Sequence, residues 1–164
     1  MSVFIPVYRL QLIRDTNFRT ASKQMCGPQE VTSLVSAYLD GADREHFVVL
    51  TRDTKGRTTG IHTVAIGSLD RVEVHPREVF KFAVLMNAAA IIVAHNHPSG
   101  DPEPSGKDRV LTRHLVEAGA LLGIPVLDHL VLGDNGTFVS LRHDRTAFPP
   151  TAAAAWCEFS RGQP

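Results

Sequence analysis

Cysteine is scarce in this 164-residue sequence, and long apolar runs are missing. The two thiols, Cys26 and Cys157, are widely separated and form no CxxC pair, which argues against a disulfide framework and fits a reducing cytoplasm. The longest apolar run, Ala88–Ala94, falls far short of the roughly 20 residues that a membrane span needs. No basic region precedes an apolar one at the N-terminus, so no signal peptide is predicted. We therefore expect a cytoplasmic protein without membrane contact.

An excess of charge of either sign is also absent. Lysine and arginine total 17, as do aspartate and glutamate, so the basic surface that dominates nonspecific nucleic-acid affinity is not indicated. A local basic patch would escape this balance, which leaves direct nucleic-acid binding open. With 43% apolar and 21% charged residues, the chain has the composition of a soluble globular protein of one domain.

Hydrophobic periodicity predicts alternating strands and helices. Helices are expected from Pro28 to about Gly41, from Pro76 to about Ala90, and from about Asp108 to Leu122. The predicted strands are Val3–Leu12, His46–Thr51, Thr58–Ile66, Ile91–Ala94, Val126–Leu132 and Thr137–Leu141. Such an order predicts an α/β fold, with a single mixed β-sheet flanked by helices. Residues 1–144 are expected to form the domain and residues 145–164 a weakly ordered tail.

Two histidines and one aspartate stand at a spacing that suits a metal ion. His95 and His97 end the most apolar strand, where residues i and i+2 point to the same side. Asp108 follows eleven residues later, behind a loop stiffened by three prolines that can return its carboxylate to the same point. Two imidazoles and one carboxylate are the protein ligands of a catalytic zinc, and they leave a fourth position for water.

Hydrolysis at such a site also needs a group that moves a proton. Glu45 precedes the predicted strand His46–Thr51, which could lie beside the His95 strand and bring the carboxylate to the metal water as general acid/base. Ser105 could donate a hydrogen bond to a developing oxyanion. Each has a simpler interpretation, since Glu45 could be a solvated carboxylate and Ser105 the N-cap of the helix that starts near Asp108.

The same residues resemble the JAMM/MPN metalloprotease motif position by position: His95-x-His97-Pro98, then Ser105 and Asp108, with Glu45 upstream. The wider sequence is similar to the bacterial RadC-like JAB domains, in the segments Val74–Phe80, His95–Pro102, Pro104-Ser105 and Leu127–Leu130. The likeness runs from about Val3 to Arg142. It implies a cytidine-deaminase-like α/β fold, zinc bound by the two histidines and the aspartate, and Glu45 as the catalytic acid/base.

JAMM relatives hydrolyse peptide or isopeptide bonds, so the resemblance implies a zinc-dependent metallopeptidase whose substrate is a protein or peptide, including a ubiquitin-like conjugate. The RadC-like branch was named for DNA repair, and its longer members carry a helix-hairpin-helix region ahead of the JAB domain. Only 44 residues precede Glu45 here, which looks like the short form. The alternative is a DNA-repair or mobile-element accessory protein whose metal site is structural or acts on nucleic acid. A non-catalytic MPN module is disfavoured because every motif residue is retained.

Several neighbouring residues have open interpretations. His129 has the look of a ligand, but a histidine hydrogen-bonded near the site is favoured over a fourth ligand, which would close the open position. Asn96 and Ser99 either orient ligands or cap the tight turn. The letters His95-Asn96-His97 do not indicate an HNH nuclease, whose residues are scattered over a ββα unit. An exposed strand edge at Val3–Leu12 would allow two copies to pair into an oligomer.

Overall fold

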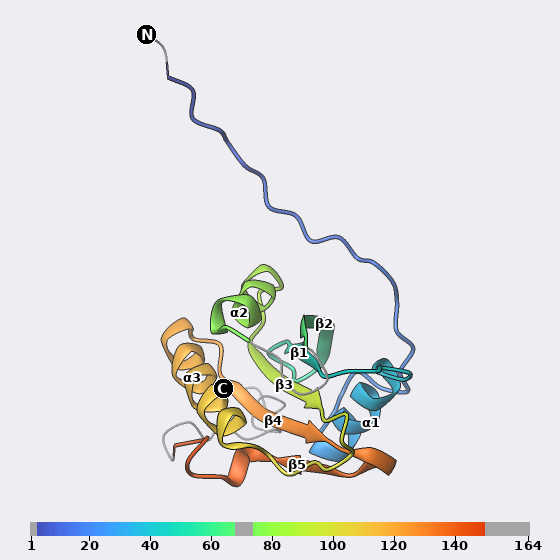
Figure 1. The fold of residues 1–164 in the computed structure, drawn as a ribbon. Helices are drawn as coiled ribbons and strands as arrows, with labels where there is room; N and C mark the ends of the chain where they lie inside the picture. The colour runs from blue at the N-terminus through green and yellow to red at the C-terminus, as the bar shows by residue number, and fades with distance from the viewer. Residues whose placement is uncertain (1–2, 68–73, 150–164) are drawn as a thin grey trace.

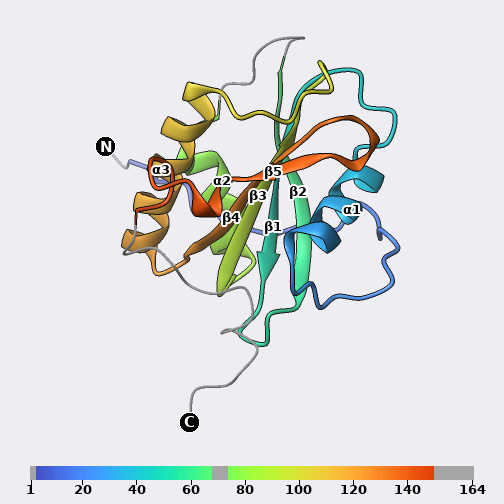
Figure 2. The ribbon, with the colours of Figure 1, turned by 90° about the horizontal axis from the view of Figure 1, so that it is seen from below.

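The computed structural model describes residues 3–67 and 74–149, which contain one mixed β-sheet with helices on both faces (Figures 1 and 2). The elements in chain order are α1 (Pro28–Tyr38), β1 (His46–Arg52), β2 (Thr58–Ile66), α2 (Pro76–Leu85), β3 (Ala90–Asn96), α3 (Gly106–Leu122), β4 (Val126–Leu132) and β5 (Phe138–Ser140), with short 3-10 helices at Asp134–Gly136 and Leu141–His143. The predicted α/β class is confirmed.

The sheet places its most apolar strand at the centre. Its order is β2-β1-β3-β4-β5, and β3 pairs antiparallel with β1 and parallel with β4. The parallel pair is joined by α3, as a crossover connection requires. Because a central strand is covered on both faces, it reads as a continuous apolar run, and residues 90–94 are all fully buried.

The two faces of the sheet carry different helices. α2 and α3 cover one face and α1 covers the other (Figure 2). Alternate residues of β1 follow this division: Phe47 and Val49 pack with α2 and α3, whereas Val48 and Leu50 pack with α1. In β3, the side chains of Ile91 and Val93 also pack on the α2 and α3 side. Because side chains alternate along a strand, His95 points to that same side of the sheet.

Local signals explain the helix boundaries. Pro28 and Pro76 start α1 and α2, and Ser105 is the N-cap of α3, in a capping box with Asp108. The second helix ends at Leu85 rather than near Ala90. Asn87 adopts a left-handed conformation with φ of 48°, which no helix interior tolerates, and the apolar residues from Ala90 onward belong to β3.

The predicted strand at Val3–Leu12 is wrong. Residues 3–20 form no regular element, and the segment extends away from the sheet (Figure 1). Its apolar side chains are exposed, with Phe4 at 91% and Val7 at 96%. Alternation of apolar residues shows which face a strand would bury, but among the described residues no neighbouring strand pairs with this segment. Pairing of two copies through this segment stays a prediction, without the expected strand edge.

At the other end, packing continues past residue 144. Ala147 and Phe148 are buried in the core on the α3 side of the sheet. The remainder of the predicted tail, residues 150–164, lies outside the described residues. Among the residues that are described, no helix combines the length and apolar character needed to cross a membrane.

Candidate metal centre

Three side chains from two elements and their connection meet at one point. His95 is the second-to-last residue of β3, His97 directly follows that strand, and Asp108 lies in the first turn of α3. His95 Nε2 is 3.1 Å from His97 Nε2 and 3.5 Å from Asp108 Oδ1, and His97 Nε2 is 3.8 Å from Asp108 Oδ2. In the described part of the chain these residues form the only group of three histidine, cysteine or acidic side chains that could hold a metal ion.

The spacing of these atoms fits a tetrahedral zinc ion. With bonds of about 2.0–2.1 Å to each ligand, tetrahedral zinc sets its ligand atoms about 3.3 Å apart. The observed separations of 3.1, 3.5 and 3.8 Å bracket that value. Two imidazoles and one carboxylate leave one of the four positions for water or substrate. The three predicted ligands are therefore together, and their donor set suits a catalytic rather than a closed structural zinc.

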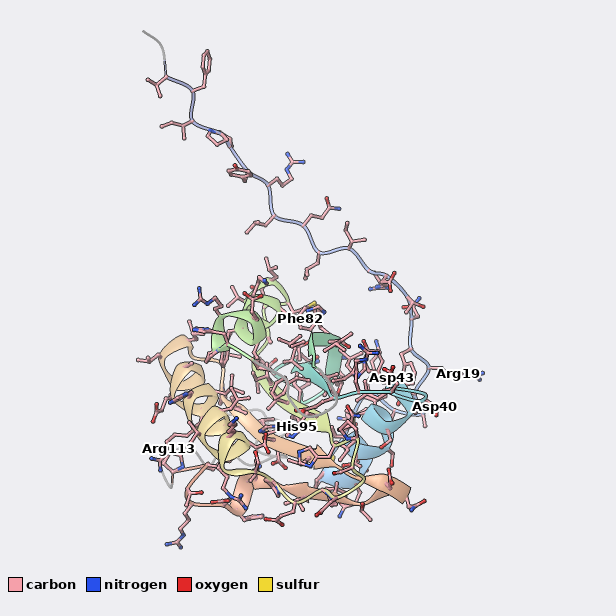
Figure 3. The ribbon with its side chains drawn as sticks, viewed as in Figure 1. Arg19, Asp40, Asp43, Phe82, His95 and Arg113 are labelled. Carbon is pink, nitrogen blue, oxygen red and sulfur yellow. The ribbon has the colours of Figure 1, made fainter. Side chains whose placement is uncertain are left out.

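His95 is the buried member of the group. Its side chain is 1% exposed, between the sheet and α3 (Figure 3), and stacks on Phe47 at a centroid distance of 6.0 Å. Its Nδ1 lies 2.8 Å from Nε2 of His129 on β4. His129 Nδ1 in turn lies 2.5 Å from the hydroxyl of Thr112 on α3. The favoured interpretation of His129 is confirmed, because it is hydrogen-bonded to His95 through the ring nitrogen that faces away from His97 and Asp108.

His97 is held by a loop instead of by the core. Its side chain is 19% exposed, and its Nδ1 lies 2.7 Å from the carbonyl oxygen of Asp101. Gly100, with φ of 80°, turns the chain between them, and its N–H donates to the carbonyl of His97 at 3.0 Å. The hydroxyl of Ser99 accepts from the Asp101 N–H at 3.4 Å, which makes Ser99 a cap of the turn.

Asp108 is held in its ionised form. Burial acts to raise the pKa of this carboxyl, but the neighbouring His97 and His95 and the hydrogen bonds from Ser105 lower it well below its usual range. The Ser105 hydroxyl and amide donate to Asp108 Oδ2 at 2.6 and 2.7 Å. The N-cap interpretation of Ser105 is confirmed. Its predicted oxyanion role would require the hydroxyl to leave Asp108, and this role stays a prediction.

Glu45 lies beside the same point, in a buried position 9% exposed directly before β1. In the antiparallel pair of β1 and β3, Phe47 lies opposite His95, which directs Glu45 toward His97. The pKa of His97 is raised, chiefly by the neighbouring Asp108 and also by the charge of Glu45, against the effect of burial. The expected pairing of β1 with β3 is thus observed. The carboxylate of Glu45 is close enough to influence the pKa of His97.

Asn96, between the two histidines, fixes the backbone on both sides of Glu45. Its Oδ1 accepts from the His46 N–H at 2.8 Å, and its Nδ2 donates to the Arg44 carbonyl at 3.1 Å. Asn96 alternates with the histidines along the chain, so its side chain leaves β3 on the face opposite to the metal site. These contacts match neither of the two open interpretations, because Asn96 holds the backbone on both sides of Glu45 instead of a metal ligand or the tight turn.

Thr112 and the Asp101 carbonyl are site groups that sequence reasoning missed. Thr112 stands four residues after Asp108, on the same face of α3, and that i, i+4 relation was the available signal. The contact of His97 with the Asp101 carbonyl could not be predicted, because every residue has a backbone carbonyl and the residue type carries no signal for it.

This chain is similar to known proteins over most of its length. The model of the RadC-like JAB domain matches residues 25–146. The UPF0758 protein of Moorella thermoacetica is 52% identical over 115 residues, which are 70% of this chain and 50% of that protein. The UPF0758 protein of Desulforamulus reducens is 50% identical over the same shares of the two chains. The UPF0758 protein of Methanosarcina acetivorans is 43% identical over 138 residues, 84% of this chain and 60% of that protein.

The chain thus spans between 50% and 60% of the length of these curated relatives. The matched residues 25–146 contain the whole sheet and every residue of the candidate metal centre. From the family model and this placement we conclude that the chain belongs to the RadC-like JAB domain family.

Proposed function

We propose that this protein is a zinc-dependent metallohydrolase that cleaves a peptide or isopeptide amide. One observation carries the proposal: His95, His97 and Asp108 offer ligand atoms within 4.8 Å of one another, with the buried carboxylate of Glu45 beside them. A metal centre with one free position next to a proton acceptor is the arrangement that amide hydrolysis needs.

The roles of the residues follow from their surroundings. Zinc held by the three ligands would lower the pKa of a water molecule to about 7. Asp108 brings one negative charge to that position, kept ionised by Ser105 and the histidines. The carboxylate of Glu45 accepts the proton of the attacking water and delivers it to the amide nitrogen of the leaving group. Asn96 holds the backbone at Arg44 and His46, so that Glu45 keeps its place beside His97.

The amide bond as the target is supported by the family. The motif residues of the JAMM metalloproteases are all present, and the family match spans residues 25–146. The partners we propose are a protein or peptide, with a ubiquitin-like conjugate as one candidate. The formal net charge of zero supports a protein substrate over a polyanion, because nucleic-acid affinity depends chiefly on cationic side chains.

The test begins with the zinc content of the purified protein and continues with a screen of peptides and ubiquitin-like conjugates. Glu45→Gln should retain zinc and lose hydrolysis by at least about a hundredfold, because the proton acceptor is removed. Asp43→Asn is the matched control: it removes a carboxylate two residues away, exposed and paired with Arg44, and should keep full activity. A Glu45→Gln protein as active as the wild type would overturn the proposed mechanism.

A further inference from the structure

A chain of buried hydrogen bonds runs behind His95 and ends on another part of the site. His129 on β4 and Thr112 on α3 are both 0% exposed. The contacts are His95 Nδ1 to His129 Nε2 at 2.8 Å, His129 Nδ1 to Thr112 Oγ1 at 2.5 Å, and Thr112 Oγ1 to the Asp108 carbonyl at 2.5 Å. The chain thus starts at one candidate ligand and finishes on the backbone of another.

The last acceptor gives the chain a direction. The Asp108 carbonyl can only accept, so the single hydroxyl hydrogen of Thr112 must go to it. The hydroxyl oxygen of Thr112 then accepts from His129 Nδ1–H. Buried in the core and with no carboxylate among these contacts, the His129 imidazole is most stable as the neutral ring. Its Nε2 therefore carries a lone pair.

That lone pair determines the state of His95. His129 Nε2 accepts a hydrogen bond, so the hydrogen of the His95 ring is on Nδ1. Nε2 of His95 is left with its lone pair facing His97 and Asp108, which is the form that a metal ion binds. Every donor and acceptor in the chain is matched, and reversing any one bond would leave two hydrogens or two lone pairs opposed.

We propose that His129 and Thr112 are positioning residues that set the tautomer of His95 and so prepare the metal centre before an ion arrives. They also tie two ligands together, because Thr112 belongs to the first turns of α3 together with Asp108, while His129 contacts the ligand on β3. This inference rests on the metal centre of the proposed function. It does not depend on which bond is cut.

The test combines a tautomer measurement with zinc affinity. In the metal-free wild type, nitrogen-15 NMR of the imidazole rings should show His95 and His129 both protonated at Nδ1. Thr112→Val removes the hydroxyl at nearly constant volume and should weaken zinc binding by about 10- to 100-fold. Thr112→Ser keeps the hydroxyl and should restore binding close to the wild-type value. Zinc affinity is read by competition with a chromophoric chelator.

Thr51→Val is the matched control. Thr51 is also 0% exposed and hydrogen-bonded, to Thr59 at 2.9 Å, but it lies four residues after Phe47, the β1 residue that pairs with His95. It should lower stability without changing zinc affinity.

The outcomes separate the inference from the proposed function. His95 protonated at Nε2 in the wild type would overturn the inference, and this reading needs no variant to fold. Equal zinc affinity of Thr112→Val and wild type would overturn it as well. A wild-type protein that binds no zinc would instead refute the metal centre itself.

Discussion

His95 and His97 are two residues apart and face the same point, yet the protein holds them by different means. His95 is 1% exposed and is supported by side chains from β4 and α3. His97 is 19% exposed and is supported by one backbone carbonyl in the loop before α3. In both cases Nδ1 is engaged and Nε2 faces the candidate metal position.

The difference shows that one chemical requirement can be met by the core or by a loop. The support of His95 is part of the packing between the sheet and α3, so disturbing it must also disturb the fold. The support of His97 depends on the course of a few backbone residues around Gly100. The first arrangement couples metal binding to stability, and the second leaves the two nearly independent.

Replacing each histidine with alanine should separate the two arrangements most clearly. Both His95→Ala and His97→Ala should abolish stoichiometric zinc binding. In metal-free protein, His95→Ala should also lower the free energy of unfolding by about 3 kcal/mol, because it leaves a cavity and an unmatched His129. His97→Ala should lower it by less than about 1 kcal/mol. Urea unfolding with a chelator present measures both values.

His114→Ala is the control for these variants, since His114 is an exposed histidine of α3. It should change neither zinc binding nor stability. Equal destabilisation by His95→Ala and His97→Ala would remove the distinction between core and loop support.

Gly100→Ala should disturb the loop support alone. Gly100 has φ of 80°, and an added Cβ would lie 2.3 Å from Asp134 Oδ2. The loop must shift, which moves the Asp101 carbonyl away from His97 and should weaken zinc binding by about tenfold. The strain should cost about 1–3 kcal/mol of stability. Gly106→Ala is the control, because its Cβ would meet nothing within 4 Å. Unchanged zinc affinity in Gly100→Ala would show that the carbonyl does not orient His97.

Ser105→Ala should have a smaller effect, on the third ligand. The variant removes one of the two Ser105 donors to Asp108 and the side-chain cap of α3. The loss of a helix N-cap costs about 1 kcal/mol, and zinc affinity should fall only a few-fold, since the backbone N–H still holds the carboxylate. Thermal unfolding and chelator competition measure the two effects. A complete loss of zinc would assign Ser105 a larger part than the geometry gives it.

Asp128→Asn should leave zinc affinity unchanged although its neighbour in sequence is His129. The pKa of Asp128 is raised to about 6 by burial, against hydrogen bonds from Ser140 and the backbone. Between pH about 4 and about 6 the folded state then binds more protons than the unfolded state. The free energy of unfolding should therefore fall as pH rises through this window, by up to about 1.4 kcal/mol per pH unit.

In Asp128→Asn that slope should disappear, which urea unfolding at several pH values would show. A slope that persists unchanged would mean that another group carries it. A fall in zinc affinity would mean that β4 as a whole, and not the His129 contact, supports the site.

The sequence predicted the elements that have strong local signals. Pro28, Pro76 and the Ser105 cap mark helix starts, and the short, β-branched apolar run at Ile91–Ala94 indicated a buried strand. The strand predicted at Val3–Leu12 was wrong, because alternation of apolar residues indicates a face that could be buried but not whether another strand is present to pair with it.

The two histidine ligands were predictable because their signal is also local in the sequence. The i, i+2 spacing of His95 and His97 fixes their relative direction within one strand. Thr112 and the Asp101 carbonyl were not predictable, because their contacts depend on how α3 and the loop dock against β3. His129 was singled out as a residue, but its hydrogen-bond partner became clear only from the pairing of β3 with β4.

Zinc titration of the metal-free wild type, followed by X-ray absorption of the loaded protein, tests the metal centre most directly. We predict one zinc per chain, with two imidazole nitrogens and one carboxylate oxygen among about four light-atom ligands. The same titration of His97→Ala should show no stoichiometric binding. A wild-type protein that fails to bind zinc at micromolar concentration, or a His97→Ala protein that binds it equally well, would contradict the account.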